Sequence, residues 1–387
     1  MRVLFLTPFP PSSERPDAMH HPRLLSRRHE VTMVLLYRHQ TELASVDGAA
    51  RSLHRVCALR LPRTTSLSSC ASRVLTRWPL YLAYYYTRAL MQAIRQVAAE
   101  ERPDVVHAST LRMAPYAAGL DGGLKVCNLQ DVLTTRYEGY VKTMTPSLGW
   151  PLDFEEWIKL GRFEPALWRQ MHRVGVVSEE EAADARRVLP GITPDVIRPG
   201  IDPEYFEPLN DRARGPSIVF LGRFSYRPNV EAALRAALEI FPLVKSRVPS
   251  ARLILVGSDP PARIRRLAGR DGVEVTGWVD DVRPFLGRAA LALTPMTIGG
   301  GVKYKVLQAL AMATPVVTNA LGVRGIGLAP GSEVVVAEDN QALADACAEL
   351  LVDPVRQRQI GEAGRDAVVG RHAWDIVGES LEVFHRI

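Results

Sequence analysis

Short apolar runs, rich in β-branched residues and leucine, alternate with longer helical patterns along this 387-residue chain. Such runs, apolar on both faces and separated by helices, are typical of parallel strands in a sheet covered on both sides. In the first half we expect strands at Arg2–Thr7, Glu30–Leu36, Arg55–Leu59, Asp104–Ala108, Leu124–Asn128 and Arg173–Ser178. In the second half we expect them at Ser217–Gly222, Arg252–Gly257, Val273–Gly277, Leu291–Pro295, Pro315–Asn319 and Glu333–Ala337. The pattern predicts an α/β protein with doubly wound sheets.

The alternation occurs twice, with a break at residues 195–217 that is rich in proline, glycine and charge. That composition is typical of a domain junction. We predict Rossmann-like domains over residues 1–198 and 217–370, a linker over 199–216 and a C-terminal helix over 371–387. Two doubly wound domains that face each other would form a cleft, and ligands of such sheets bind beyond the carboxyl ends of strands.

Composition excludes several classes of protein. The chain is 47% apolar and 23% charged, an ordinary globular balance, and its formal charge of +6 is modest. The basic residues form no stripe or nucleic-acid-binding motif, so we expect no nucleic-acid partner. The N-terminal apolar run is too short for a signal-peptide core, and no segment approaches the ~20 apolar residues of a membrane span. Four scattered cysteines fit reduced thiols, so we expect a cytoplasmic protein, with peripheral contact to the inner face of the membrane as an alternative. We expect a monomer or a homodimer.

The segment Arg77–Glu100 contains clustered aromatic residues and predicts one long helix. We expect Tyr84, Leu90 and Ile94 to pack on the sheet, with the other tyrosines at the edge of the cleft. The alternative is a helix that contacts a membrane surface or the acceptor.

Three consecutive glycines, Gly299–Gly301, follow a predicted strand and lead into a predicted helix over residues 302–313. Glycines let backbone N–H groups approach a phosphate, and a helix N-terminus supplies more of them. Lys303 and Lys305 stand in the first turn, where the helix dipole disfavours a cation unless an anion binds nearby. The pattern indicates a phosphate site; a flexible loop with solvated lysines is the alternative.

A second cationic segment follows the strand at 217–222. Arg223 lies just beyond that strand, and Arg227 precedes the next helix. Planar guanidinium groups suit the oxygens of a diphosphate. The neighbouring pair Asp280–Asp281 more simply caps the helix that follows it, and we predict no metal site.

These stretches, in this order, resemble the retaining family-four glycosyltransferases of the GT-B fold, which build bacterial exopolysaccharides and glycoconjugates. The similarity includes "MRVLFLTPFPP", "RPDVVHA", "VVSEEEA", "VIRPGIDPEYFEP", "FLGRFSYRPN", "LILVGSDP", "VTGWVDDVRPFL" and the glycine segment. It implies transfer of a sugar from a nucleotide diphospho-sugar to an acceptor with retention, without cofactor or metal. It also implies that the last helix crosses back onto the first domain.

The resemblance implies that the second domain binds the donor, with the base near Gly277–Val279, the diphosphate at the arginines and the Gly300–Val302 amides, and the ribose at residue 308. The expected donor-binding residues are Arg223, Arg227, Gly257, Gly277, Trp278, Val279, Gly299, Gly300, Gly301, Val302, Lys303, Lys305 and Gln308. Where relatives often have two glutamates, this chain has Gly300 and Gln308. An amide oxygen still accepts a ribose hydroxyl, but without charge assistance.

The first domain would bind the acceptor, a sugar, a lipid-linked intermediate or a small molecule. The expected acceptor-side residues are Pro10, Gln130 and Asp131. Relatives tend to have a histidine at the position of Gln130 and a Gly-Gly loop in place of the segment 12–21. The candidate catalytic residues are Arg223, Asp131 and His107, the last of which could instead be a buried structural histidine.

Two alternatives remain open from the sequence. One is a nucleotide-sugar epimerase or sugar phosphorylase on the same fold. The other is a catalytically weakened nucleotide-sugar-binding protein, in which Gln308 and Gln130 reflect lost activity.

Overall fold

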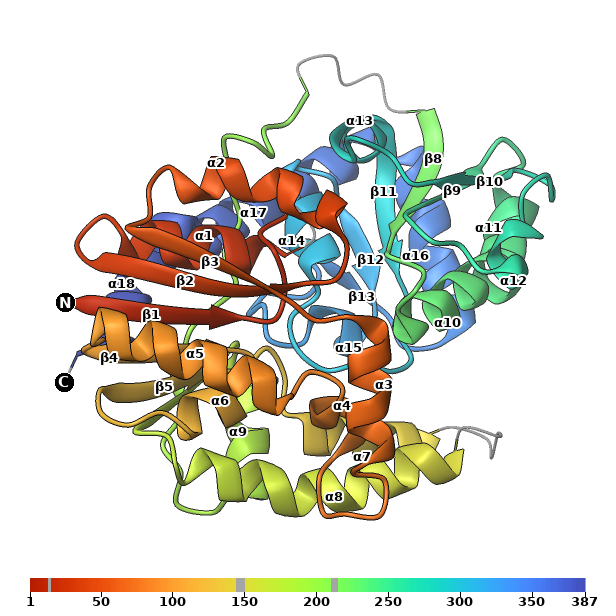
Figure 1. Cartoon of the computed structure of the whole chain (residues 1–387). Coiled ribbons are helices and arrows are strands. Elements are labelled where there is room, and N and C mark those ends of the chain that lie inside the picture. Colours follow the sequence, from red (N-terminus) through yellow and green to blue (C-terminus); the bar gives the residue numbers. More distant parts are fainter. Residues whose placement is uncertain (13–14, 144–149, 210–214, 387) are drawn as a thin grey trace. The chain divides into compact units, whose positions relative to one another are not determined.

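A computed structural model describes residues 1–12, 15–143, 150–209 and 215–386 (Figure 1). The chain forms two compact units, each described by itself below. Unit 1 comprises Met1–Gly200 and Trp374–Ile387, and unit 2 comprises Ile201–Ala373. Residues 13–14 of the segment 12–21 and residues 210–214 of the predicted linker lie outside the described residues.

Unit 1 contains a parallel sheet in which the strand order is β3-β2-β1-β4-β5-β6-β7. Its strands are β1 (Arg2–Thr7), β2 (Glu30–Tyr37), β3 (Arg55–Arg60), β4 (Val105–Ser109), β5 (Leu124–Asn128), β6 (Arg173–Val176) and β7 (Asp195–Val196). The chain builds one half outward from β1 and then returns to β4 to build the other half. The order therefore reverses between β1 and β4, which pair directly.

Helices cover the unit 1 sheet, and a hydrophobic core lies on each face. They are α1 (Pro16–Leu25), η1 (Gln40–Ser45), α2 (Val46–Ala50), α3 (Arg63–Ala71), α4 (Leu80–Ala83), α5 (Arg88–Glu101), α6 (Ala114–Ala118), α7 (Leu133–Thr143), α8 (Trp150–Trp168), α9 (Glu179–Val188) and α18 (Trp374–Phe384). The last of these belongs to unit 1 and packs on α1. Trp374, Val377, Leu381 and Phe384 of α18 are part of the core of that face.

Unit 2 repeats the design with the order β10-β9-β8-β11-β12-β13, again all parallel. Its strands are β8 (Gly215–Leu221), β9 (Arg252–Val256), β10 (Val273–Gly277), β11 (Ala289–Thr294), β12 (Val316–Thr318) and β13 (Val335–Val336). Its helices are α10 (Arg227–Arg235), the π-helix η2 (Ala236–Ile240), α11 (Phe241–Arg247), α12 (Ala262–Arg265), α13 (Arg283–Arg288), α14 (Tyr304–Ala311), α15 (Ala320–Val323), α16 (Asn340–Val352) and α17 (Pro354–His372). Here the order reverses between β8 and β11.

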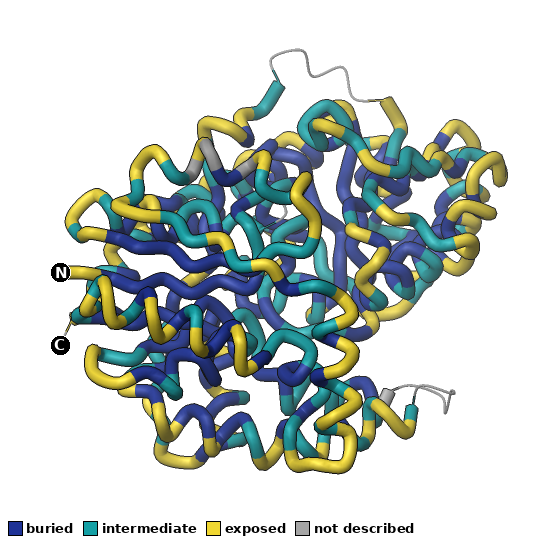
Figure 2. The backbone as a smooth tube through the Cα atoms, in the orientation of Figure 1, coloured by how far each residue is buried: buried dark blue, intermediate teal, exposed yellow. Residues whose placement is uncertain are grey.

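The α/β class and the two parallel sheets are confirmed. Each of the twelve predicted strands is present, with ends within two residues of the prediction, and most strand residues are buried (Figure 2). The two-residue strand β7 at the sheet edge was not predicted. It is too short to carry a pattern of its own.

The prediction of one helix over Arg77–Glu100 is wrong. The chain breaks between α4 and α5, where Thr87 caps α5 by accepting a hydrogen bond from the Leu90 N–H at 3.1 Å. Leu90 and Ile94 are buried in the core as expected. Tyr84 instead lies beneath the Arg38 guanidinium, with 4.5 Å between the guanidinium carbon and the ring centroid.

Helix α17 packs closely against α14, the helix that follows the glycine segment. Two glycines of α17 permit this approach. A Cβ atom at Gly361 would lie 2.2 Å from the Ala313 carbonyl oxygen, and one at Gly364 would lie 2.6 Å from a methyl group of Leu310. The position of α14 therefore depends on the absence of side chains on this face of α17.

We expect Gly361→Ala to lower the free energy of unfolding by about 1–3 kcal/mol, because the added methyl group meets backbone that cannot move aside cheaply. Gly370→Ala, in the same helix but with open space around it, should leave stability unchanged or raise it by up to about 1 kcal/mol. Urea titrations of the two variants measure the difference. Equal effects would contradict the close packing of α17 on α14.

Candidate functional site

The loops after β8 and β11 meet at the carboxyl edge of the unit 2 sheet. Lys305 Nζ, on the β11 side, donates to Asn229 Oδ1, on the β8 side, at 2.6 Å. A Cβ atom at Gly299 would lie 3.5 Å from the Pro228 ring. The reversal of strand order thus brings the two predicted cationic segments into contact, at the place where doubly wound sheets bind ligands.

The glycine loop is held by one of its own lysines. Lys303 is only 8% exposed, and its Nζ donates to the carbonyl oxygens of Gly300 (3.1 Å) and Gly301 (2.7 Å). Gly299 and Gly301 have φ values of +123° and +64°, which residues with side chains rarely adopt. Helix α14 begins at Tyr304, two residues later than predicted. The alternative of a loop with solvated lysines is therefore wrong for Lys303.

The alternative of a solvated lysine is also wrong for Lys305. Its ammonium group lies 4.3 Å from the centroid of the Phe220 ring and binds Asn229. Burial, and next the charge of Lys303, lowers the pKa of Lys305 to about 7. Gln308, one turn further along α14, is half-buried. A buried cation beside a glycine loop gains most from an anion placed nearby.

Asn229 connects these parts, and sequence reasoning did not single it out. Its Nδ2 donates to the Arg223 carbonyl oxygen at 2.9 Å, and its Oδ1 accepts the hydrogen bond from Lys305 Nζ. The only signal was its position in the first turn of a helix that follows a strand. The Arg223 side chain is exposed, and its Nε donates to Ser225 Oγ at 2.7 Å. Arg227 is half-buried as the first residue of α10.

The ends of β8, β9 and β10 lie side by side next to this loop. Gly257, after β9, accepts no side chain, because a Cβ atom there would lie 1.8 Å from the Gly222 carbonyl oxygen. Its N–H donates to the Gly277 carbonyl oxygen at 3.1 Å. Trp278 follows with 66% exposure, and Val279 is half-buried. The predicted donor-binding residues thus share one edge of one sheet.

The acidic pair after β10 acts on the following helix. Asp281 Oδ1 accepts the backbone N–H of Arg283, the first residue of α13, at 2.9 Å, and the carboxylate also pairs with the Arg283 guanidinium; the N-cap position itself is Val282. That guanidinium lowers the pKa of Asp281. Within the described residues no group of three or more His, Cys, Asp or Glu side chains could hold a metal ion.

In unit 1 the segment after β5 carries Gln130 and Asp131. Gln130 Nε2 donates to Asp17 Oδ2 of α1 at 2.8 Å, and Asp131 pairs with Arg136 at 2.6 Å. Pro10 is half-buried after β1. The Gln130–Asp17 contact connects the segment after β5 to the first turn of α1.

Two buried glutamates fix the start of α7 beside Asp131. Glu181 accepts the Val132 N–H at 2.8 Å. Glu164 accepts the N–H groups of Leu133 (3.1 Å) and Thr134 (2.9 Å), and burial raises the pKa of Glu164 to about 7. Sequence reasoning missed both residues, because each acts from a helix distant in the sequence.

His107 is placed differently from the other candidates. It pairs in register with Phe5 inside the sheet, and its side chain is fully buried. His107 Nδ1 lies 2.8 Å from Nε2 of His385, just beyond α18, and burial holds the pKa of His107 well below its usual value. The ring therefore lies in the core rather than beside Gln130 and Asp131, and this placement favours a structural role.

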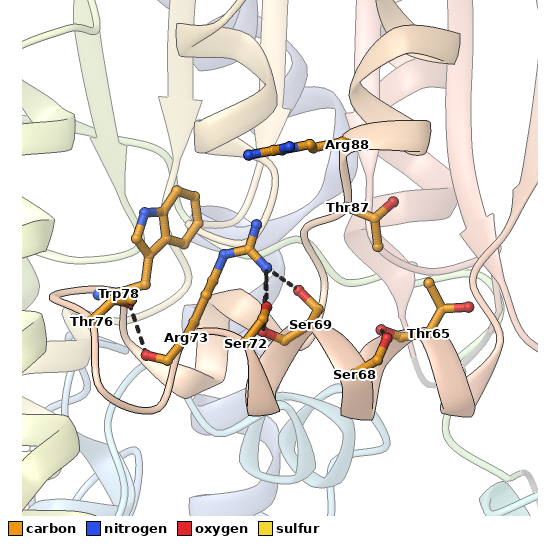
Figure 3. A pocket seen from close by; sticks show the side chains of 9 residues that line it. All are labelled: Thr65, Ser68, Ser69, Ser72, Arg73, Thr76, Trp78, Thr87 and Arg88. Atoms are coloured by element: carbon orange, nitrogen blue, oxygen red, sulfur yellow. Dashed lines mark hydrogen bonds between the residues drawn. The ribbon is translucent and has the colours of Figure 1, made fainter.

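A pocket that contains none of these residues lies elsewhere in unit 1. It has a volume of about 710 Å³ and is lined by α3, the segment after it and the start of α5 (Figure 3). Arg73 reaches across it to the Ser69 and Ser72 hydroxyl groups. None of the predicted site residues lines this pocket.

No described helix combines the length and apolar character that crossing a membrane requires.

The low pKa of Lys305 makes stability depend on pH in a defined direction. Between about pH 7 and 10.5 the unfolded chain binds a proton at Lys305 that the folded chain does not, so folding is favoured as the pH rises. We expect the free energy of unfolding to rise with pH over this range relative to that of Lys305→Met, by at most about 1.4 kcal/mol per pH unit. Urea titrations from pH 7 to 10 measure this, with Arg358→Met as a control for the lost charge. Parallel curves for the unaltered protein and Lys305→Met would contradict the burial of this ammonium group.

Two family models match successive parts of the chain. "Glycosyltransferase Family 4" matches residues 21–205, and "Glycosyl transferases group 1" matches residues 215–353. Among individual proteins, the chain is 29% identical over 223 residues to a GDP-mannose-dependent α-(1-6)-phosphatidylinositol monomannoside mannosyltransferase of Mycobacterium tuberculosis. That match covers 53% of this chain and 56% of the relative, so the chain spans about half the length of this relative.

Two longer matches agree with this. The chain is 26% identical over 330 residues to an α-maltose-1-phosphate synthase of Mycolicibacterium smegmatis, covering 74% of this chain and 80% of the relative. The fold is that of sucrose-phosphate synthase from Thermosynechococcus elongatus, with a TM-score of 0.73, 18% identity and coverage of 100% and 98% of the two chains. The chain belongs to the family 4, or group 1, glycosyltransferases and has their GT-B fold.

Proposed function

We propose that this protein transfers a sugar from a nucleotide diphospho-sugar to an acceptor hydroxyl group, with retention of anomeric configuration and without a metal ion. The observation that carries the proposal is the meeting of the loops after β8 and β11 in unit 2. There an exposed Arg223 and a glycine loop supported by Lys303 and Lys305 form a cationic, side-chain-poor surface. Such a surface suits a diphosphate.

In this proposal unit 2 binds the donor. The diphosphate lies against Arg223, Arg227 and the backbone N–H groups of residues 300–302. The base lies on the backbone of residues 277–279, beside the exposed side chain of Trp278. The ribose meets Gln308. Lys305, at its low pKa, takes up a proton when the anion binds, which strengthens the interaction.

The chemistry assigned to these groups is stabilisation of the leaving diphosphate. Arg223 and the N–H groups offset the negative charge that develops as the bond to the sugar breaks. The acceptor approaches from the same face, and an oxygen of the leaving group receives the proton of its hydroxyl group. Retention of configuration follows from this front-face geometry.

Unit 1 binds the acceptor in this proposal, at Pro10, Gln130 and Asp131. Asp131 orients the hydroxyl group, and its own orientation is fixed by Arg136 and by the glutamate-capped start of α7. The acceptor in the name of the Mycobacterium tuberculosis relative is a lipid. We therefore keep the inner face of the membrane, together with the cytoplasm, as the proposed place of action.

We expect Arg223→Ala to weaken nucleoside diphosphate binding by about tenfold or more, because a charge-assisted hydrogen bond contributes about 1.5–3 kcal/mol. Isothermal titration with UDP, GDP and ADP measures the loss, and Arg358→Ala, on an exposed face of α17, serves as the control. If no nucleoside diphosphate binds the unaltered protein, the donor assignment fails.

We expect Gln308→Glu to tighten binding of the same nucleoside diphosphate several-fold, because a carboxylate makes a stronger hydrogen bond to a ribose hydroxyl than an amide does. The 2′,3′-dideoxy nucleotide is the matched control, and its affinity should not improve. Unchanged affinity for the ribose form would place the ribose away from Gln308. Incubation of the donor without acceptor, with and without inorganic phosphate, tests the two enzymatic alternatives: an epimerase gives isomerised sugar in both cases, and a phosphorylase gives sugar phosphate only when inorganic phosphate is present.

A further inference from the structure

Four arginines converge at the carboxyl edge of the unit 1 sheet, and we call them the arginine cluster: Arg15, Arg38, Arg112 and Arg136. They come from four different connections. Arg15 follows β1, Arg38 follows β2, Arg112 follows β4 and Arg136 lies in α7 after β5. Because the carboxyl ends of these strands are neighbours in the sheet, residues far apart in sequence meet here.

Aromatic rings join the arginine cluster into one structure. The Arg112 guanidinium carbon lies 4.4 Å from the centroid of the Tyr81 ring, 5.0 Å from that of Tyr85 and 5.2 Å from that of Phe9. Each other arginine shares one of these rings. Arg15 lies 4.2 Å over Phe9, Arg136 lies 5.3 Å from Tyr81, and Arg38 lies 5.7 Å from Tyr85. Rings that hold guanidinium groups in this way fix their orientation before any ligand arrives.

Arg112, at the centre, is buried against these rings and feels the charge of Asp131 without pairing with it directly. Its guanidinium donates to the Tyr81 hydroxyl group, and it forms no ion pair within the described residues. Its Nε is buried and has no hydrogen-bond partner there. Burial and the charges of Arg15 and Arg136 lower the pKa of Arg112 to about 9. Asp131 pairs with Arg136, next to Arg112 in the cluster.

The location of the cluster points to a ligand. It surrounds the carboxyl ends of β1 and β4, between which the strand order of unit 1 reverses. Doubly wound sheets bind their ligands at this reversal. Like charges gathered there are unfavourable in the empty protein, and an anion with several acceptor oxygens relieves the repulsion.

We propose that the arginine cluster binds a phosphate group of the acceptor, so that the substrate of this enzyme is a phosphorylated molecule. This rests on the proposed function, because it places the acceptor on unit 1. Guanidinium groups that approach from several connections match the tetrahedral oxygens of a phosphate better than the single plane of a carboxylate. Tyr81 and Tyr85 then offer apolar ring surface to the part of the acceptor beside the phosphate. A soluble sugar phosphate and the phosphodiester of a lipid headgroup share this chemistry.

Binding of glucose 6-phosphate tests the proposal, with glucuronate and methyl glucoside as carboxylate and neutral controls. The titrations use the full chain with saturating nucleoside diphosphate, so that the donor site is occupied. We expect glucose 6-phosphate to bind more tightly than either control. Vesicles of phosphatidylcholine with or without phosphatidylinositol form the lipid arm. Phosphatidylcholine also carries a phosphodiester, balanced by its own ammonium group, so this comparison tests an anionic headgroup. Tighter binding to glucose 6-phosphate or to phosphatidylinositol identifies the source of the phosphate.

Variants assign the binding to the cluster. We expect Arg112→Met to lose about tenfold or more in affinity for the phosphate probe that binds, and Arg38→Gln, at a partly exposed position, to lose a smaller factor. Arg186→Met, exposed on α9 of the same unit, is the matched control and should bind normally. If Arg112→Met does not fold, Arg38→Gln alone decides.

Three results would overturn the proposal: no binding of either phosphate probe, equal binding of methyl glucoside or glucuronate, or loss of binding in Arg186→Met as large as that in the cluster variants. Failure of the proposed function is seen separately. In that case no nucleoside diphosphate binds to unit 2. Binding of the phosphate probe is then measured without the nucleotide, and the affinities of Arg223→Ala and Arg112→Met are compared to see in which unit the probe binds.

Discussion

In each sheet, the strand that comes first in the chain pairs directly with the strand at which the order reverses. This pairing determines where chemistry can occur in the protein. In unit 2 that pair is β8 and β11, and in unit 1 it is β1 and β4. Neighbouring parallel strands deliver their next residues to the same edge, but the helices that follow them go to opposite faces of the sheet. A space for a ligand is left between the diverging connections. Both candidate sites, the glycine loop with Arg223 and the arginine cluster, lie at such a point.

The two sites neutralise their positive charge to different degrees. In unit 2 the loop carbonyl groups accept hydrogen bonds from Lys303, and Asn229 accepts one from Lys305. These bonds partly offset the positive charge of the lysines and also support the loop. In unit 1 the Arg112 guanidinium, which forms no ion pair within the described residues, lies against aromatic rings, and these attract a cation more weakly than a carboxylate does. Each arrangement leaves positive potential for an anion without leaving the empty protein strongly repulsive.

Much of the architecture could be predicted from local pattern, because buried parallel strands are apolar along their whole length. The break before Thr87 could not, since the residues from Trp78 to Glu101 have helical propensity on both sides of it. The helix dipole correctly indicated an unusual environment for Lys303 and Lys305, but their partners, including Asn229 76 residues away, depend on the tertiary fold. The arginine cluster left no signal in the sequence, because each arginine alone resembles a surface residue. Its members become neighbours only through the strand order of the sheet.

The position of α18 has a consequence for how the protein is made. Unit 2 is a continuous stretch of chain, whereas unit 1 needs its first 200 residues and also the final helix, whose Trp374 ring fills the space left by the absent side chain of Gly200. During synthesis from the N-terminus, unit 2 can therefore complete its core first. Unit 1 is synthesised earlier, but part of one face of its sheet stays uncovered until α18 has been made, so it completes its core after unit 2.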